Sequence, residues 1–276
     1  MTMSEYTLQV SSIFSKKNWN INASEDKESL SKMINLGSSL TDDEREMLVA
    51  LLSKYIKISF NDYVNKLLDS INIMDETKFT GIKDFYILPL KRPEDFKKTK
   101  SSDTISYLLC NIPIFRNTKL FLNKSLNLIS YDNIPKKIST TQTKQLILVD
   151  DFAGSGNTAL QCLDYLNLTM GIPKNKMTSI FMCMMSQSYR ILKSNGYEVY
   201  SNVLLEKGIS DIQDLQIKKK YTSLMNELES KFDFRECDRF GYDKVESLIT
   251  FIKTPNNTFP IFWDGKRNKN APFERK

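Results

Sequence analysis

The chain has 276 residues, 41% of them hydrophobic and 26% charged, which is typical of a globular protein with one large α/β domain or a core with an appendage. It has no histidine, which excludes a histidine general base and histidine ligands to zinc. The net charge of +6 favours anionic ligands mildly, and four widely spaced cysteines predict reduced thiols in a cytoplasmic protein. No apolar run is long enough to span a membrane and no signal peptide pattern opens the chain, so we expect no membrane association.

Residues 1–78 are predicted to form a helical accessory segment. Thr41 and Glu44 have the spacing of a capping box that opens a helix, and Met47 and Leu51 lie on its apolar face. A second amphipathic helix is predicted over residues 60–73. Because no residue pattern here is typical of catalysis, we expect this segment to pack against the rest of the chain or to bind a partner.

From residue 79 to residue 276, short apolar segments alternate with helical patterns. The strands are predicted at residues 85–90, 114–121, 126–129, 146–149, 178–185, 199–204 and 245–253. The helices are predicted around residues 105–110, 158–168, 189–193 and 214–232. This alternation predicts an α/β domain, a mostly parallel sheet flanked by helices, followed by a C-terminal extension.

The segment 145–158 carries the clearest functional signal. Asp150 and Asp151 follow an apolar strand that is predicted to end at Val149, and a turn with Gly154 and Gly156 leads into a helix. Ligands of open parallel sheets bind at the carboxyl ends of the strands. Carboxylates suit sugar hydroxyls or a metal, while the turn and the helix start suit a phosphate. The segment therefore predicts a site for a phosphorylated sugar.

Other motifs with similar letters fit this segment less well. Gly154, Gly156 and Ala159 formally match the dinucleotide-binding fingerprint, but two carboxylates intervene between the strand and the glycines and would repel a pyrophosphate. The acidic strand end of nucleotide triphosphatases requires a phosphate loop ending in Gly-Lys-Ser/Thr, which no glycine of this chain supplies. A capped turn with two surface acids remains a structural alternative.

The order of apolar strand, two acids, small residues, glycine and threonine over residues 146–158 resembles the phosphoribosyl pyrophosphate motif of the type I phosphoribosyltransferases. The resemblance implies that family's fold and the binding of phosphoribosyl pyrophosphate with Mg²⁺, held indirectly through the pyrophosphate or also by Asp150 and Asp151. It further implies that these two aspartates are the catalytic acids on the ribose hydroxyls. The residues implied to bind the 5-phosphate are Ala153, Gly154, Ser155, Gly156, Asn157 and Thr158.

A basic loop follows the strand at 85–90, at the position where the family contacts pyrophosphate. It begins with Lys91 and Arg92, and the residues that we assign to the pyrophosphate are Lys98, Lys100, Ser101 and Ser102. Its sequence departs from the usual short, glycine-containing form of this loop. A solvated charged loop is therefore the alternative.

The C-terminal tail places amides between prolines and aromatic residues. Asn256, Asn257 and Phe259 have side chains that can read or stack on a nucleobase, so they are candidates for the acceptor site. The alternative is an aromatic tail docked on the core. The Gly241–Tyr242 segment and the tail resemble phosphoribosyltransferase-like proteins of bacterial antiphage cassettes, including retron-associated ones.

The resemblances together imply a phosphoribosyltransferase that transfers ribose 5-phosphate to an unknown acceptor, as an effector in antiphage defence. The alternative is a non-catalytic sensor of phosphoribosyl pyrophosphate or a nucleotide, or a module that binds RNA or protein. The expected partners beyond the ligand are RNA or a protein of a defence system, and we expect a homo-oligomer or a member of a larger complex.

Overall fold

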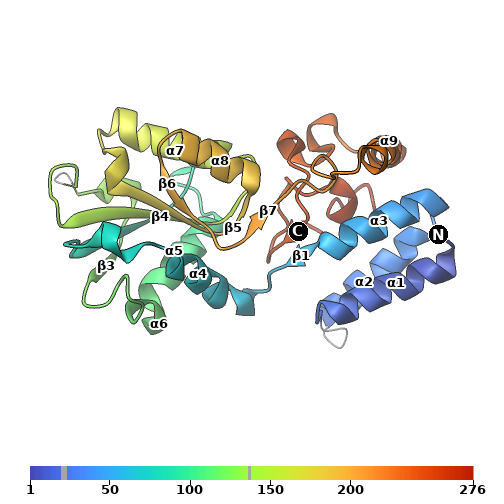
Figure 1. The fold of residues 1–276 in the computed structure, drawn as a ribbon, viewed down its shortest axis with the longest axis horizontal. Coiled ribbons are helices and arrows are strands. Elements are labelled where there is room, and N and C mark those ends of the chain that lie inside the picture. The colour runs from blue at the N-terminus through green and yellow to red at the C-terminus, as the bar shows by residue number, and fades with distance from the viewer. Residues whose placement is uncertain (20–23, 136–137, 276) are drawn as a thin grey trace. The chain divides into compact units, whose positions relative to one another are not determined.

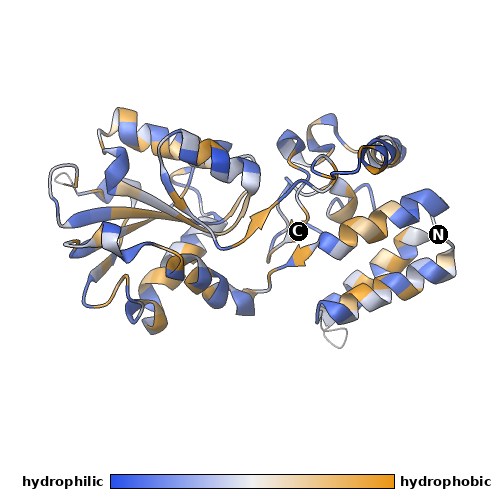
Figure 2. Ribbon diagram, viewed as in Figure 1, coloured by the Kyte–Doolittle hydropathy of each residue, from blue (hydrophilic) through white to orange (hydrophobic). Residues whose placement is uncertain are grey.

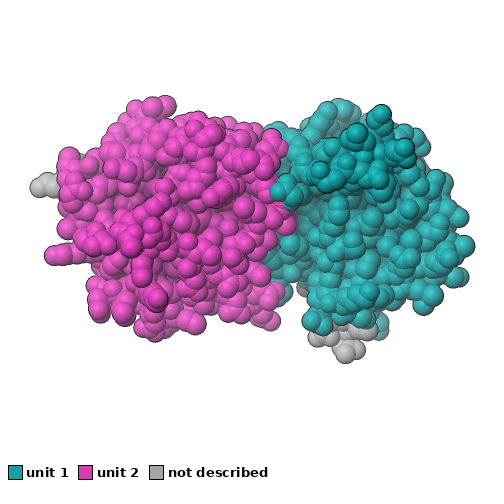
Figure 3. Space-filling model, viewed as in Figure 1, with its two compact units in different colours: residues 1–60, 206–276 teal, residues 61–205 magenta. Residues whose placement is uncertain are grey.

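The computed structural model describes residues 1–19, 24–135 and 138–275, and the chain divides into two compact units (Figure 3). Unit 1 combines both ends of the chain, Met1–Phe60 and Glu206–Lys276, and unit 2 is the middle, Asn61–Leu205. Unit 2 thus begins before residue 78, where the sequence predicts a domain boundary. The predicted boundary at residue 78 concerns domains that fold separately, and it stays a prediction.

Unit 2 is built on a parallel sheet with the strand order β3-β2-β4-β5-β6 (Figure 1). The strands are β2 (Asp84–Pro89), β3 (Ser125–Leu128), β4 (Lys144–Ala153), β5 (Met177–Met185) and β6 (Glu198–Tyr200). The short β7 (Leu204–Leu205) pairs in parallel with the end of β5. The α/β class with a mostly parallel sheet is therefore confirmed.

Helices cover both faces of this sheet. One face carries α4 (Tyr63–Asn72) and α5 (Ser101–Asn111), and the other carries α7 (Asn157–Asp164) and α8 (Ser186–Ser194), as Figure 1 shows. Every residue of β5 is buried, which is expected of a central strand packed on both sides. The remaining α-helix of this unit is α6 (Pro113–Arg116), and a π-helical turn, Tyr165–Thr169, extends α7.

Two strand predictions in unit 2 need correction. The predicted strand at 114–121 is wrong, because Pro113 opens α6 at its first turn and hydrogen-bonded turns follow. The predicted strand at 199–204 is split into β6 and β7. The backbone at Val203 stays tied to the sheet, since its carbonyl accepts from the amide of Met184 at 2.9 Å.

Unit 1 joins three N-terminal helices to the C-terminal part of the chain. Its helices are α1 (Met3–Lys16), α2 (Ser24–Gly37), α3 (Asp42–Lys54) and α9 (Leu215–Lys231), and the alternation of polar and apolar residues along them can be followed in Figure 2. The predicted capping box is confirmed: the amide of Thr41 donates to Glu44 at 2.6 Å, and the amide of Glu44 donates to the Thr41 hydroxyl at 3.3 Å.

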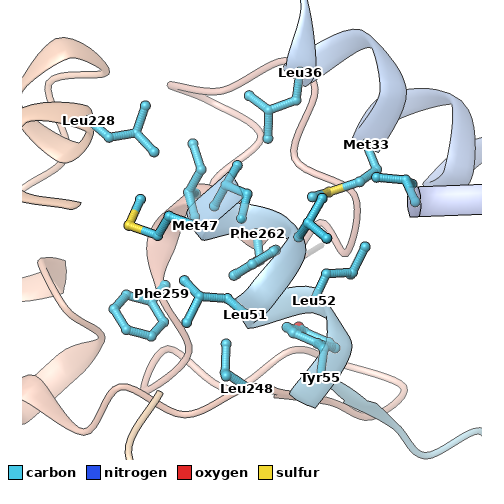
Figure 4. Packing of buried hydrophobic residues seen from close by; sticks show 14 of the residues in the cluster. Met33, Leu36, Met47, Leu51, Leu52, Tyr55, Leu228, Leu248, Phe259 and Phe262 are labelled. Atoms are coloured by element: carbon cyan, nitrogen blue, oxygen red, sulfur yellow. The ribbon is translucent and has the colours of Figure 1, made fainter. Parts of the chain in front are cut away.

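The two chain ends share one hydrophobic core in unit 1. Leu51, Leu52 and Tyr55 pack in one cluster with Phe259 and Phe262 of the tail (Figure 4). A two-stranded parallel sheet also joins the ends, pairing β1 (Ile56–Lys57) with β8 (Ile249–Thr250). The predicted strand at 245–253 is therefore reduced to two residues, and it belongs to this small sheet and not to the sheet of unit 2.

Short 3-10 turns complete both units: Phe60–Asp62, Glu76–Phe79, Pro93–Asp95, Tyr131–Asn133, Lys174–Lys176, Glu236–Asp238, Tyr242–Lys244 and Pro260–Phe262. Among the residues that the structure describes, no helix combines the length and the apolar character needed to cross a membrane.

Candidate functional site

In the sheet of unit 2, two neighbouring strands are followed by helices on opposite faces. β2 and β4 are neighbours, yet α5 follows β2 on one face while α7 follows β4 on the other (Figure 1). The carboxyl ends of two such strands diverge and leave a crevice, which is where open α/β sheets bind ligands. The predicted motif at the end of β4 lies at this switch point.

The two acids lie within β4, which continues to Ala153 and does not end at Val149. Asp150 and Asp151 are half-buried. The amide of Asp151 donates to Oδ1 of Asp150 at 2.9 Å, and the hydroxyl of Ser101, at the start of α5, donates to Oδ1 of Asp151 at 3.0 Å. The fold thus brings one residue of the predicted pyrophosphate loop, Ser101, onto one of the predicted acids.

Asp150 and Asp151 both lie in surroundings that disfavour their ionised form. Burial raises the pKa of Asp150 well above its usual range, and the neighbouring Asp151 carboxyl raises it further. Burial also raises the pKa of Asp151, against the opposing effect of hydrogen bonds from Asp150 and Ser101. A ligand that supplies hydrogen-bond donors or positive charge would favour the ionised form of the pair.

The turn after β4 requires a glycine at one position. Gly156 has φ +83° and is the N-cap of α7, and a Cβ atom there would lie 3.4 Å from Cα and Cβ of Ser188. The Ser188 hydroxyl supports the turn from behind, donating to the carbonyls of Ala153, at 3.2 Å, and Gly154. The first turn of α7 follows directly, with Asn157 and Thr158 at a helix end that favours anions.

Arg92 reaches the glycine turn after β4 from the loop after β2. Its Nε donates to the hydroxyl of Thr158 at 3.2 Å, so a guanidinium stands beside the start of α7. The sequence shows Arg92 as part of the basic loop, but the predicted pyrophosphate residues all come later in the chain. Its link to Thr158 depends on β2 lying next to β4, which the sequence alone does not reveal.

The other predicted residues of the basic loop are placed differently. Lys98 and Lys100 are exposed and both pair with Asp95, at 2.6 and 3.2 Å. Ser102 is buried, and its hydroxyl has no hydrogen-bond partner among the described residues. The cations of this loop are therefore largely engaged with the protein's own carboxylates.

Two buried residues to which the sequence assigned no role anchor the loop after β2. Lys91 is 5% exposed, pairs with Asp103 at 2.7 Å and donates to the carbonyl of Lys98 at 2.8 Å. The hydroxyl of Tyr131 accepts from the amide of Lys91 at 3.2 Å and donates to the carbonyl of Pro89 at 2.7 Å. Buried lysine and tyrosine carry no periodic sequence signal, so only the fold exposes their role.

The predicted acceptor residues lie in unit 1. Phe259 is fully buried in the cluster of Figure 4, so its ring has no open face for a base. The side-chain amide of Asn257 donates to the carbonyl of Tyr242 at 2.9 Å, and the carbonyl of Asn256 accepts from the amide of Tyr242 at 2.8 Å. The tail thus has the docked arrangement, which the sequence left open as the alternative.

The acid pair suits a Mg²⁺ ion whose other ligands are water and the phosphates of a substrate. Proteins often bind Mg²⁺ through one or two carboxylates together with waters and substrate phosphates, and Asp150 and Asp151 supply such a pair. Among the described residues, no group of three or more acidic, cysteine or histidine side chains could hold a metal alone. The donor set therefore fits a magnesium ion that arrives with a phosphorylated ligand.

Unit 2 is therefore a parallel α/β unit with two acids and a glycine turn at its switch point. A model of the family PRTase-CE, named for phosphoribosyltransferases, matches residues 17–275, and the chain belongs to this family. This membership supports a phosphoribosyltransferase-like function. Among solved structures, the orotate phosphoribosyltransferase of Aeropyrum pernix is similar at 12% identity, with a TM-score of 0.34 over 61% of this chain and 76% of that one. No curated protein matches the chain.

Proposed function

We propose that the protein binds phosphoribosyl pyrophosphate at the switch point of unit 2 and transfers its ribose 5-phosphate to an acceptor. The observation that carries the proposal is the acid pair Asp150–Asp151, which is directly followed by the Gly156 turn at the carboxyl end of β4. Membership in the PRTase-CE family supports the same ligand.

The turn and its neighbours would hold the 5-phosphate. The first amides of α7 and the side chains of Ser155 and Thr158 supply donors, and Arg92 adds a positive charge beside Thr158. A helix N-terminus stabilises an anion by about 0.3–1 kcal/mol, or ~2 when partly buried. Charge-assisted hydrogen bonds contribute roughly 1.5–3 kcal/mol each. These contributions would fix one end of the sugar.

The acid pair would then act on the ribose. Asp150 and Asp151 accept hydrogen bonds from its hydroxyls and stabilise the positive charge that develops on the ring. In the transfer, the bond from C1 to the pyrophosphate oxygen breaks, its electron pair leaves with pyrophosphate, and the acceptor's lone pair forms the new bond to C1 with inversion. Magnesium bound with the ligand would neutralise charge on the leaving pyrophosphate.

A second candidate is a sensor that binds the same ligand without turnover. Lys98 and Lys100 share Asp95, and Lys91 pairs with Asp103, so several cations of the basic loop are already engaged by the protein's own carboxylates. A weakly stabilised leaving group favours binding over transfer. The two candidates share the site and differ only in whether the bond to pyrophosphate breaks.

The discriminating experiment measures pyrophosphate release. The protein is incubated with phosphoribosyl pyrophosphate, Mg²⁺ and, in turn, free bases, nucleotides and RNA. We expect release with one acceptor class, lost in Asp150→Asn/Asp151→Asn and kept in Asp132→Asn, a control at an exposed acid of the same unit. Saturable binding without release supports the sensor, and the absence of both binding and release contradicts the shared site.

The proposed role in antiphage defence and the proposed partners depend on the resemblance of the Gly241–Tyr242 segment and the tail. We expect a strain that carries the gene within its natural neighbourhood to resist phage, and Asp150→Asn/Asp151→Asn to remove that resistance. Equal plaque counts with and without the gene would argue against this role. Copurified protein or RNA, and the mass of the purified protein, would test the partner and the oligomer.

A further inference from the structure

Unit 1 contains a pocket that none of the motifs above accounts for. It has a volume of about 700 Å³, within the range of about 300–1,000 Å³ that is usual for small-molecule sites. Its wall is formed by Trp263–Arg267, by Glu274 and Arg275, and by Arg235.

The pocket is rich in positive charge. Four lining residues are cationic, namely Arg235, Lys266, Arg267 and Arg275, against two acids, Asp264 and Glu274. Both acids already have partners: Asp264 pairs with Arg267 at 3.3 Å, and Glu274 pairs with Lys32 at 3.2 Å. The acids therefore leave much of the positive charge in the pocket uncompensated.

Two of the cations have no counter-ion. Within the described ranges of the chain, Lys266 and Arg275 make no ion pair. The guanidinium of Arg275 is partly buried and donates to the carbonyl of Thr254 at 2.8 Å, and burial lowers its pKa. Asp238 acts on Arg275 only at longer range and is bonded to Arg235 at 2.6 Å. As whole residues, Lys266 and Arg275 are exposed, so a cation without a carboxylate partner is available here to pair with a bound anion.

The backbone fixes the wall that presents these cations. The carbonyl of Trp263 accepts from the amides of Gly265 and Arg275, each at 3.0 Å. Asp264 accepts from the amides of Lys266 and Arg267, at 3.1 and 3.3 Å. A Cβ on Gly265 would lie 2.2 Å from Oε1 of Glu274, so the bare glycine lets Glu274 fold over this turn.

We propose that this pocket binds a phosphorylated small molecule of nucleotide size. Arg275, Lys266 and Arg235 hold its phosphates, since guanidinium forks match phosphate oxygens, and Glu274 accepts from a hydroxyl or amino group. The indole of Trp263 is 8% exposed and its Nε1 donates to the carbonyl of Thr258, so it offers no platform for stacking single-stranded nucleic acid. The ligand is therefore a free small molecule.

Tryptophan emission tests the proposal, because both tryptophans, Trp19 and Trp263, lie in unit 1. The whole protein is titrated with ADP and with inorganic pyrophosphate. We expect a saturable change in emission with either probe. Lys266→Glu should raise the Kd about tenfold or more, because it reverses a phosphate-binding charge. Lys219→Glu, on the exposed face of α9, should keep the Kd within about twofold.

The proposal would be overturned by the absence of a saturable response, by equal weakening in the two lysine variants, or by binding of single-stranded RNA without binding of either probe. The response should also persist in Asp150→Asn/Asp151→Asn. Its loss there would assign the signal to the site of unit 2 and would likewise overturn the proposal, whereas its persistence leaves the two sites independent.

Discussion

The end of β4 in unit 2 and the tail at residues 254–263 in unit 1 both contain polar side chains that the sequence marks as candidates for ligand binding. The structure places these side chains in different environments. In the tail, the unit itself uses the polar and aromatic groups: Trp263 bonds to Thr258, Asn257 bonds to Tyr242, and Phe259 is buried. At the end of β4, burial acts against the charge of both carboxyls, and the neighbouring Asp151 carboxyl acts further against the charge of Asp150. Polar groups that already have hydrogen-bond partners within the fold are structural. Carboxyls whose ionised form the fold destabilises mark a candidate site.

The largest loss of stability is expected from a substitution that disturbs the backbone contacts of the tail. A Cβ on Gly241, where φ is +74°, would lie 1.9 Å from the backbone oxygen of Asn257. Left-handed strain and overpacking together should lower the free energy of unfolding by about 3 kcal/mol or more in Gly241→Ala. Denaturant unfolding measures the loss. Gly171→Ala is the control, since Gly171 has φ +68° with no atom within 4 Å of its Cβ position. Equal losses would mean that the tail is not tied at Gly241.

Unit 1 should also carry a pH dependence of its own. Burial raises the pKa of Glu229 from its ordinary 4.5 to about 8, although the amide of Phe240 donates to both of its oxygens. Between these values the folded state binds more protons than the unfolded state, so stability falls as pH rises, by at most ~1.4 kcal/mol per pH unit. Unfolding at several pH values should show a shallower slope in Glu229→Gln. An unchanged slope would assign the pH dependence to other groups, such as Asp150 and Asp151.

Two glycines of unit 2, Gly156 after β4 and Gly81 before β2, separate the effect of backbone strain from the loss of function. Gly156 and Gly81 both have φ +83°, but only Gly156 has a neighbour, Ser188, within 4 Å of its Cβ position. Each alanine variant should lose about 1–2 kcal/mol of stability from left-handed strain. Only Gly156→Ala should also lose binding of phosphoribosyl pyrophosphate, measured by calorimetry. If Gly81→Ala lost binding equally, the effect of Gly156→Ala would be general destabilisation.

The smallest expected effect on stability belongs to Arg92. Its bond to Thr158 is partly exposed, so Arg92→Gln should change the free energy of unfolding by less than about 1 kcal/mol. The same variant should weaken binding of phosphoribosyl pyrophosphate about tenfold, because a charge next to the 5-phosphate is lost. Arg190→Gln, an exposed arginine of α8, is the matched control. Unchanged affinity in Arg92→Gln would remove the arginine from the site.

Local patterns predicted the strand and the turn of the candidate site but not the contacts around them. The apolar run before Asp150 and the glycine turn after it are local signals, and β4 and α7 form there as expected. Arg92 and Ser101 reach the site through strand order, and Tyr131 and Lys91 anchor the loop through burial, none of which a single segment encodes. The same limit explains unit 1, whose core and small sheet need both ends of the chain.

The most direct test is the melting temperature with and without phosphoribosyl pyrophosphate and Mg²⁺. Ligand at 100 times its Kd should stabilise the protein by about 2.7 kcal/mol. We expect a clear upward shift in the unaltered protein, none in Asp150→Asn/Asp151→Asn, and a normal shift in Asp132→Asn. An unaltered protein that shows no shift, or a double variant that shifts as much as the unaltered protein, would contradict a ligand site at the end of β4.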